Sequence, residues 1–298
     1  MSDNIKVGIS HGDINGIGYE VIMKTLRDPR ILEMCTPIIY GSPKVAAYHR
    51  KALNIHNLSL NHIRSPKEAG PRKAHVVNCI DDNIRVELGK SSAAAGEASF
   101  QAIDRASSDL KQGLIDVLVT APINKDNIQS DLFQFPGHTE FLAQIFNSAD
   151  HIMLMVSETM KIGVATTHLP LSKVAENISK ESILTKIRII AKSLQQDFAI
   201  NRPRIAVFGL NPHAGDNGLL GTEEQEIIIP AIEEAKKEGI IALGPYPADG
   251  FFGSEDYRKF DALLAMYHDQ GLIPFKLASF DRGVNYTAGL PVVRTSPA

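Results

Sequence analysis

The segment Arg204-Ile-Ala-Val-Phe-Gly-Leu-Asn-Pro-His213 carries the pattern that decides the fold, a short apolar run that ends abruptly in polar residues. A run of this kind is typical of a buried strand. Similar runs predict strands in six other places, namely Lys6–Ser10, Pro37–Tyr40, Ile115–Thr120, His151–Val156, Ile162–Thr166 and Asp261–Met266. Longer amphipathic segments between them predict helices at Gly18–Leu26, Ala94–Gln112, His138–Phe146, Lys180–Gln196 and Thr222–Lys237. This alternation indicates an α/β protein in which crossover helices join parallel strands.

The composition sets the scale and excludes several classes of protein. The 298 residues are enough for two lobes, because single cores stop growing near about 250–300 residues. Lys and Arg number 31 against 34 Asp and Glu, so there is no basic field for nucleic acid. The start, MSDNIKVGIS, lacks a signal-peptide pattern, and no apolar stretch approaches the roughly 18 residues of a membrane span. Cys35 and Cys79 form no CxxC motif or disulfide framework, so we expect a cytoplasmic protein without nucleic-acid or membrane partners.

Polar clusters directly follow five of the predicted strands. In an open α/β sheet, ligands bind outside the carboxyl ends of the strands. We therefore expect these clusters to line one cleft. In chain order they are His11-Gly12-Asp13, Ile123-Asn124-Lys125, His168, Asn211-Pro212-His213 and His268-Asp269-Gln270.

Three of these strand ends carry a histidine in the same setting, with an apolar strand before it and a turn residue after it. They are His168, His213 and His268. Three imidazole ligands with one open position are typical of a catalytic Zn²⁺ site or of a similar ion. The alternative is that each histidine only caps its strand or bonds a loop carbonyl. Three such histidines in one sheet favour the metal site.

Two junctions between a loop and a helix are possible anion sites. Gly12–Gly18 opens a helix with several glycines but does not match G-x-G-x-x-G, and a tight turn explains it equally well. Phe135–Glu140 leads into a helix whose first residues, His138 and Thr139, could hold a phosphate together with free backbone N–H groups. An ordinary capped helix start is the alternative there.

The motifs taken together resemble a known family. In chain order they are GDINGIG, TAPINK, FPGHTEFLA, ATTHLPL, LNPHAGDNGLLGTEE, YPADGFF, MYHDQGLIPFK and NYTAGLPVVRTSP. The chain is thereby identified as a member of the 4-hydroxythreonine-4-phosphate dehydrogenase family of pyridoxal phosphate biosynthesis. The match runs from Gly12 to Pro297 in one order.

The resemblance implies an oxidoreductase that uses NAD, with NADP as the alternative, and a divalent ion such as zinc, magnesium or cobalt. The implied substrate is 4-phosphooxy-L-threonine, whose oxidation and decarboxylation give 3-amino-2-oxopropyl phosphate. The nearest alternative is a paralogous D-threonate or D-erythronate 4-phosphate dehydrogenase, which differs at the C2 substituent. Two further interpretations of the chain are a metal-dependent hydrolase and an inactive phosphoacid-binding protein.

The resemblance also implies a fold similar to isocitrate and isopropylmalate dehydrogenases, with the active site in the cleft between two α/β lobes. We predict a first lobe from 1–127 and roughly 277–298, and a second from 128–276 that holds the metal ligands and the interface of a homodimer. The family continues beyond position 298 into an HGTA-type segment and a final helix. If that tail is absent, we expect impaired NAD binding. His11 and Asn15 depart from the usual MGDPAGIG turn.

Residue roles follow from the resemblance position by position. His168, His213 and His268 match the metal ligands, with His268 reaching across from the partner subunit. Five residues match substrate contacts, namely His138, Thr139, Lys276, Asn285 and Arg294. Asp249 falls where the family has an acidic residue near the site. Asp249, Lys125 and a metal-bound water are the possible general bases, with Asp249 slightly favoured, and no residue is assigned to NAD.

Overall fold

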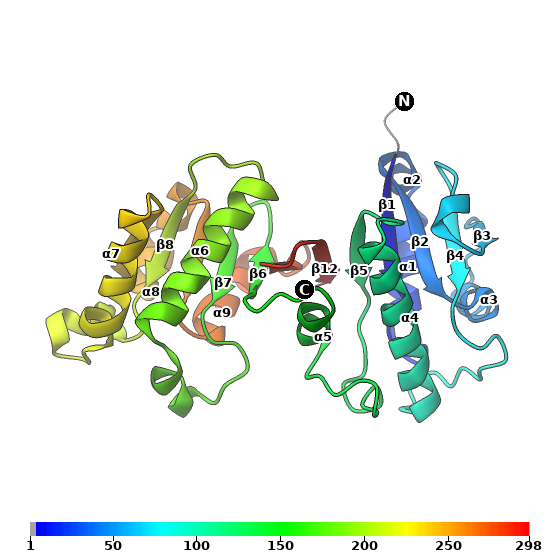
Figure 1. Cartoon of the computed structure of the whole chain (residues 1–298), viewed down its shortest axis with the longest axis horizontal. Coiled ribbons are helices and arrows are strands. Elements are labelled where there is room, and N and C mark those ends of the chain that lie inside the picture. The colour runs from blue at the N-terminus through cyan, green and yellow to red at the C-terminus, as the bar shows by residue number, and fades with distance from the viewer. Residues whose placement is uncertain (1–3, 298) are drawn as a thin grey trace. The chain divides into compact units, whose positions relative to one another are not determined.

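The computed structural model describes residues 4–297, which form two compact units. Unit 1 comprises residues 4–147 and 291–297, and unit 2 comprises residues 148–290 (Figure 1). The boundaries lie later than the predicted divisions after 127 and near 276. The reason for the first difference is α5 (His138–Ile145), whose Phe141 packs on Phe100 and Phe133 of unit 1. Residues 1–3 and 298, which belong to the predicted first lobe, lie outside the described residues.

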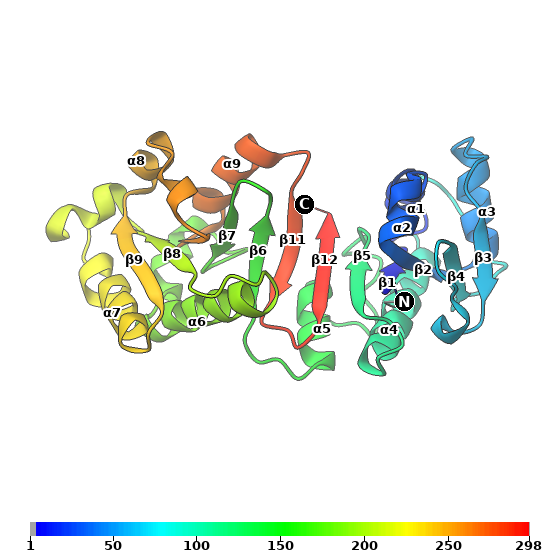
Figure 2. The same cartoon turned by 90° about the horizontal axis from the view of Figure 1, so that it is seen from above.

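Unit 1 is built on a parallel sheet with the strand order β3-β4-β2-β1-β5-β12. Although β12 comes from the far end of the chain, it pairs with β5, with Val293 opposite Val117 (Figure 2). The strands are β1 (Ile5–Ser10), β2 (Cys35–Gly41), β3 (Leu60–Ile63), β4 (Ala74–Asn78), β5 (Val117–Thr120) and β12 (Val293–Pro297).

Helices cover both faces of the sheet in unit 1. In Figure 2, α1 and α3 lie on one face and α4 lies on the other. The helix α4 is rich in alanine, and its buried Ala95 and Ala98 allow close packing on the sheet core. The helices are α1 (Gly18–Leu26), α2 (Pro29–Met34), α3 (Pro43–Ala52), α4 (Ala93–Lys111) and α5, with a 3-10 turn at Pro66–Glu68.

Unit 2 has a mixed sheet with the strand order β11-β6-β7-β10-β8-β9. The four strands β7, β10, β8 and β9 are parallel, whereas β6 runs antiparallel to both β7 and β11. The strands are β6 (Ile152–Val156), β7 (Lys161–Val164), β8 (Arg204–Phe208), β9 (Ile241–Tyr246), β10 (Ala262–Ala265) and β11 (Val284–Ala288).

The helices of unit 2 also lie on two faces. Figure 2 shows α6 and α7 on one face and α8 and α9 on the other. The helices are α6 (Lys180–Gln196), α7 (Ile229–Lys237), α8 (Ala248–Gly253) and α9 (His268–Ser279). Short 3-10 turns occupy Leu171–Lys173, Ala175–Asn177, Pro212–Gly218 and Asp256–Lys259, and a π-helical turn occupies Glu224–Ile228.

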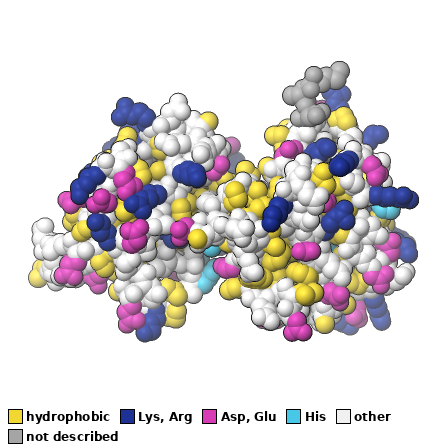
Figure 3. All heavy atoms as spheres, viewed as in Figure 1, with side chains coloured by type: hydrophobic (Ala, Val, Ile, Leu, Met, Phe, Trp, Pro, Cys, Tyr) yellow, Lys and Arg dark blue, Asp and Glu magenta, His cyan; other side chains and the backbone are white. Residues whose placement is uncertain are grey.

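The surface mixes charges of both signs. On the face shown in Figure 3, Lys and Arg side chains alternate with Asp and Glu, without a patch of a single sign. None of the helices within residues 4–297 combines the length and the apolar character that a membrane crossing requires.

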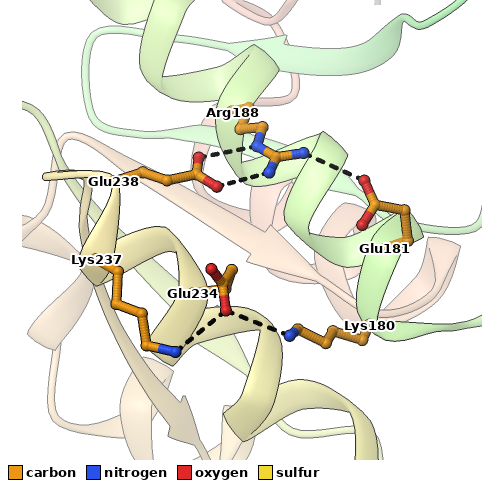
Figure 4. A network of polar contacts seen from close by, with 6 residues as sticks. All are labelled: Lys180, Glu181, Arg188, Glu234, Lys237 and Glu238. Carbon is orange, nitrogen blue, oxygen red and sulfur yellow. Dashed lines mark hydrogen bonds and ion pairs between the residues drawn. The ribbon is translucent and has the colours of Figure 1, made fainter.

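A network of charged side chains links α6 to α7 and to Glu238, which directly follows α7 (Figure 4). Arg188 donates to both carboxylate oxygens of Glu238 at 2.9 and 2.6 Å, and it also reaches Glu181 at 3.2 Å. Glu234 accepts from Lys180 at 3.4 Å and from Lys237 at 3.3 Å. A single exposed ion pair of this kind contributes little to the free energy of unfolding. The bidentate pair of Arg188 and Glu238 has a defined geometry and connects α6 with the end of α7.

The predicted elements compare with the structure as follows. All seven predicted strands are confirmed with small shifts at their ends, and the α/β class is confirmed. The helix predicted over Thr222–Lys237, with a kink expected at Pro230, is confirmed as a helical segment in which a π-helical turn at Glu224–Ile228 runs directly into α7. Pro230, in the first turn of α7, lacks the N–H of a regular helical hydrogen bond, and the irregularity of the helix lies next to it. The elements not predicted are β3, β4, β9, β11, β12, α2, α3, α8 and α9.

Candidate active site

The strand order of unit 2 places the predicted metal ligands after the carboxyl ends of neighbouring strands. The neighbouring parallel strands β7, β10 and β8 lead at their carboxyl ends to His168, His268 and His213 in that order. The next strand, β9, leads to Asp249 in the first turn of α8. Ligands of α/β proteins bind at such carboxyl ends. Three imidazoles and one carboxylate therefore follow four adjacent strands, although they are far apart in sequence.

His168 and His268 form a close pair. Their ring centroids lie 5.8 Å apart, with an angle of 43° between the rings. Asp269 Oδ1 lies 2.8 Å from His268 Nδ1. If Nδ1 carries the proton, Nε2 of His268 is left with a lone pair for a ligand. A cavity of about 320 Å³ adjoins the pair and is lined by Thr167, His168, Leu169, Leu171, Val174, Tyr267, His268 and Asp269.

His213 stands apart from this pair on an exposed turn. From His213 to Asn217 every residue has a positive φ, between 42° and 80°. Within residues 4–297 no three His, Cys, Asp or Glu side chains are grouped closely enough to hold a metal ion. The single chain thus supplies two adjacent imidazoles, after β7 and β10, and a third after β8, the strand next to β10.

Side chains that bond to the backbone tie these strand ends together. Thr166 donates through Oγ1 to Met266 O at 2.8 Å, which joins the ends of β7 and β10. Gln270 accepts from Met266 N and donates to Gly209 O, both at 2.7 Å, which joins the ends of β10 and β8. The strand ends that carry the histidines are therefore braced by Thr166, which was not predicted as a site residue, and by Gln270, which was predicted to line the cleft but without this role. Only the position of Gln270 within the YHDQG motif could have indicated it.

Unit 1 holds a second cluster, built around Arg294 of β12. Arg294 is 3% exposed and donates to Thr120 Oγ1 from Nη2 at 2.6 Å and from Nε at 3.2 Å. Its Nη1 lies 3.5 Å from Thr139 Oγ1 in the first turn of α5. Burial lowers the pKa of Arg294 to about 10, against an opposing effect of Glu140, so the guanidinium remains charged at neutral pH. A buried cation thus faces the N-terminus of a helix.

His138 and Lys125 belong to the same cluster. Burial, followed by the charges of Arg294 and Lys125, lowers the pKa of His138 to about 3. His138 is therefore neutral at neutral pH, and its buried Nε2 has no hydrogen-bond partner among the described residues. Lys125 Cε lies 3.9 Å from the place that a Cβ on Gly137 would occupy. Two cations, a hydroxyl and a neutral imidazole at the start of α5 are suited to an anion.

The Gly12–Gly18 segment is a tight turn whose polar groups are bonded within unit 1. Asp13 Oδ1 accepts from Asn15 N at 2.8 Å, and Asn15 Oδ1 accepts from Glu87 N at 2.7 Å. Gly12 has a φ of 74°, and a Cβ there would lie 2.2 Å from Pro122 O. Of the two interpretations of this segment, the structure favours the turn, and Asn15 has a structural role in it.

The remaining predicted contacts lie in unit 2. Lys276 is an exposed residue of α9, two turns after His268. Asn285 lies on β11, where it is opposite Met155 of β6, and it is half-buried. Asp249 is exposed. The predicted substrate residues thus divide between the units, with His138, Thr139 and Arg294 in unit 1 and the other two in unit 2.

The fold and these two clusters define an α/β protein with imidazoles at the strand ends of one unit and a cationic cluster in the other. The chain belongs to the PdxA family, because a family model described as "Pyridoxal phosphate biosynthetic protein PdxA" matches residues 33–298. This confirms the family that the motifs indicated.

Individual relatives agree with this assignment. The chain is 56% identical over 301 residues to a 4-hydroxythreonine-4-phosphate dehydrogenase of Bacteroides thetaiotaomicron, in an alignment that covers 100% of this chain and 82% of that protein. It is 39% identical to a D-threonate 4-phosphate dehydrogenase of Cupriavidus necator, with 99% and 90% covered. The crystal structure of the 4-hydroxythreonine-4-phosphate dehydrogenase of Klebsiella pneumoniae is similar with a TM-score of 0.89 at 35% identity, with 99% of this chain and 89% of that chain covered.

Proposed function

We propose that this protein oxidises 4-phosphooxy-L-threonine with NAD and that the product loses CO₂ to give 3-amino-2-oxopropyl phosphate. Membership of the PdxA family and the names of its relatives support an oxidoreductase of pyridoxal phosphate biosynthesis. The observation that carries the proposal is the order of β7, β10, β8 and β9, which puts His168, His268, His213 and Asp249 at adjacent strand ends. The proposal includes a cytoplasmic location and the two-lobed arrangement of isocitrate and isopropylmalate dehydrogenases.

The donor set of unit 2 fits a divalent ion such as Zn²⁺, Co²⁺ or Mg²⁺. His168 and His268 lie side by side, and Asp269 is placed to orient His268. We assign the third ligand to His213, since three protein ligands with one open position are usual in catalytic sites. When bound, such an ion supplies positive charge that makes the substrate hydroxyl more acidic and the later ketone more electrophilic.

The chain's own residues handle the proton of the substrate hydroxyl. Oxidation removes two electrons and one proton from carbon as a hydride, which the nicotinamide accepts, while a base takes the proton from oxygen. Asp249 is the base we favour, because it follows the strand next to β8 and is exposed to solvent. The carboxylate then leaves as CO₂, and the electron pair of the broken C–C bond is protonated at carbon.

The cluster in unit 1 is assigned to the anionic end of the substrate. Arg294 and Lys125 provide the positive charge, and the Thr139 hydroxyl and the free N–H groups of α5 provide hydrogen bonds. His138 is neutral, and its buried Nε2 is assigned one hydrogen bond to the substrate. Lys276 and Asn285 are assigned to the substrate from unit 2.

We propose that the protein acts as a homodimer through unit 2. Exposed apolar side chains collect on the elements that carry the histidines. On and after α9 they recur at helical spacing, with Ile273 64%, Leu277 89% and Phe280 78% exposed. Leu171 and Leu219, after β7 and β8, are 72% and 78% exposed. Apolar surface of this kind on a soluble protein indicates an interface, and we infer a second copy as the partner.

Mixing two inactive variants tests whether His268 serves the partner's site. If it does, random mixing of His213→Ala chains with His268→Ala chains makes about half of the dimers mixed. In each mixed dimer, one of the two sites has both histidines, so the mixture regains about a quarter of the wild-type activity. If each chain supplies all its own ligands, as the His168–His268 pair within one chain would allow, the mixture stays inactive.

A D-threonate 4-phosphate dehydrogenase is the second candidate function. The Cupriavidus necator relative carries that name and is 39% identical over nearly the whole chain. The two substrates share the phosphate, the reacting hydroxyl and the carboxylate, and differ in an ammonium or a hydroxyl at C2. The names of the relatives disfavour a hydrolase and an inactive binding protein.

The proposal is tested by NADH formation with each phosphorylated substrate on samples whose metal content has been measured. We expect turnover with 4-phosphooxy-L-threonine that is lost on chelation and regained with Zn²⁺ or Co²⁺. Preference for D-threonate 4-phosphate would select the second candidate, and turnover of either substrate without NAD would overturn both.

A further inference from the structure

The loop that carries His213 is built around a buried carboxylate, that of Glu224. This side chain is 2% exposed and lies in the π-helical turn that follows the loop. Its Oε1 accepts from the backbone N–H groups of Leu210 and Asn211, both at 2.7 Å. Its Oε2 accepts from the side-chain amide of Asn211 at 3.0 Å. All three donors come from the two residues that precede Pro212 and His213.

The turn packs closely against this carboxylate. A Cβ on Gly215 would lie 2.5 Å from Glu224 Oε2, and a Cβ on Gly209 would lie 3.0 Å from Glu224 Oε1. His213 and Ala214 have φ values of 54° and 51°, a left-handed conformation that L-residues adopt only when other contacts fix it. Glu224 supplies such contacts on both sides of His213.

The position of Glu224 agrees with a role in the site. A π-helical turn in place of a regular helix start is uncommon and occurs often near functional sites. Here it brings Glu224 beneath the loop, while Gln270 fixes Gly209 O of the same loop to the turn that carries His268. The loop of His213 is thus held by Glu224, and Gln270 connects it to the turn of His268. In the described contacts neither side chain bonds to an imidazole.

We propose that Glu224 is a positioning residue that holds the loop from Leu210 to Asn217 in the conformation that presents His213 as a metal ligand. The inference rests on the proposed function, because it takes His213 as a ligand. The carboxylate accepts from the backbone N–H groups of two half-buried residues, Leu210 and Asn211, so the loop keeps one conformation before any metal binds.

The test uses Glu224→Gln in the full-length chain, with Co²⁺ as the probe. A glutamine keeps the volume but turns an NH₂ group toward donors that need an acceptor. We expect Co²⁺ affinity, measured by titration of its visible absorption, to fall roughly 10- to 100-fold. We also expect faster hydrogen exchange in residues 210–217 of the metal-free variant. Unchanged affinity and unchanged exchange in this variant would overturn the proposal.

Two controls separate positioning from general stability. Glu223 is the other carboxylate that accepts from the side-chain amide of Asn211, with Oε2 at 2.7 Å from Asn211 Nδ2. Among the described contacts, Glu223 accepts from no backbone N–H of the loop. We therefore expect Glu223→Gln to keep Co²⁺ affinity within about twofold of the wild type. Asp109→Asn removes an equally buried carboxylate in unit 1 and should lower stability without altering Co²⁺ affinity. An equal loss of affinity in Asp109→Asn would overturn the proposal.

The test also distinguishes failure of the inference from failure of the proposed function. If the wild type and His213→Ala bind Co²⁺ equally, His213 is not a ligand and the metal site assigned under the proposed function fails. If His213→Ala loses Co²⁺ while Glu224→Gln keeps it, the metal site stands and the role of Glu224 is refuted.

Discussion

Histidines follow strands in both units, but their surroundings are opposite. In unit 1, His11 comes directly after β1 and is completely buried, stacked on Tyr19 with 5.3 Å between the ring centroids. Burial lowers its pKa to about 4. In unit 2, His168 and His213 come after β7 and β8 and are exposed. A strand followed by an imidazole is therefore no sign of a ligand by itself.

The path of the chain after the histidine makes the difference. After His11 the chain folds back so tightly that a Cβ on Gly18 would lie 2.1 Å from His11 O. After His213 it forms an exposed left-handed turn, and after His168 it enters loops that line a cavity of about 320 Å³. A histidine can bind an external ligand only where the following residues leave its ring open.

The largest expected effect separates the two kinds of histidine. His213→Ala should abolish Co²⁺ binding and lower kcat/KM by about 10³-fold or more, since the lost charge stabilisation is worth several kcal/mol. His11→Met, which removes a histidine at the end of a strand in unit 1, should keep Co²⁺ affinity within about twofold. Co²⁺ affinity is measured for both variants by titration of the visible absorption of the bound ion. Equal losses in both would show that the comparison is mistaken.

A smaller effect should separate the two proposed roles of charged residues. Asp249→Asn in unit 2 should lower kcat by roughly 10²-fold with little change in KM, because a general base acts in the transition state. Unchanged turnover would remove Asp249 from that role.

Lys125→Met in unit 1 should act mainly on binding. Removal of one cation from the cluster of Arg294 and His138 should raise KM about 10-fold and change kcat less, as expected for an interaction with the unreacting phosphate. Steady-state kinetics with the phosphorylated substrate measure both constants. A fall in kcat that exceeds the rise in KM would make Lys125 the better candidate for the base.

The smallest effect concerns stability in acid. His11 has a pKa of about 4 in the folded protein against 6.5 as its ordinary value. As the pH falls through 6.5 the unfolded chain takes up the proton first, so the free energy of unfolding decreases down to about pH 4. His11→Met removes the pH dependence of the free energy of unfolding that comes from His11. The pH dependence that comes from His138 is the same in the wild type and in the variant. Urea unfolding should show that the wild type loses about 2 kcal/mol more than the variant between pH 7.5 and pH 4.5.

The sequence was most informative where buried strands end in polar residues. The runs before His168, His213 and His268 are predominantly apolar because β7, β8 and β10 lie inside the sheet of unit 2. The missed strands lack that signature. The edge strand β9 contains Gly244 and Pro245, β11 alternates polar with apolar residues, and β12 is mostly polar.

The remainder depended on contacts between distant residues. The helix α9 contains Gly271 and Pro274, which local propensity assigns to a loop, yet its buried Phe275 packs into the core of unit 2. The burial of His11 and the neutral state of His138 follow from neighbours that are far away in sequence. Spacing along the chain carries no information on such contacts.

Unit 2 is inserted into unit 1, since the chain leaves unit 1 after residue 147 and returns at 291. Nascent domains fold as they emerge from the ribosome. We therefore expect residues 148–290 to complete their own sheet while the place beside β5 is still empty. Arg294 arrives only with β12, so a nascent chain acquires its buried guanidinium after every histidine considered above has already been synthesised.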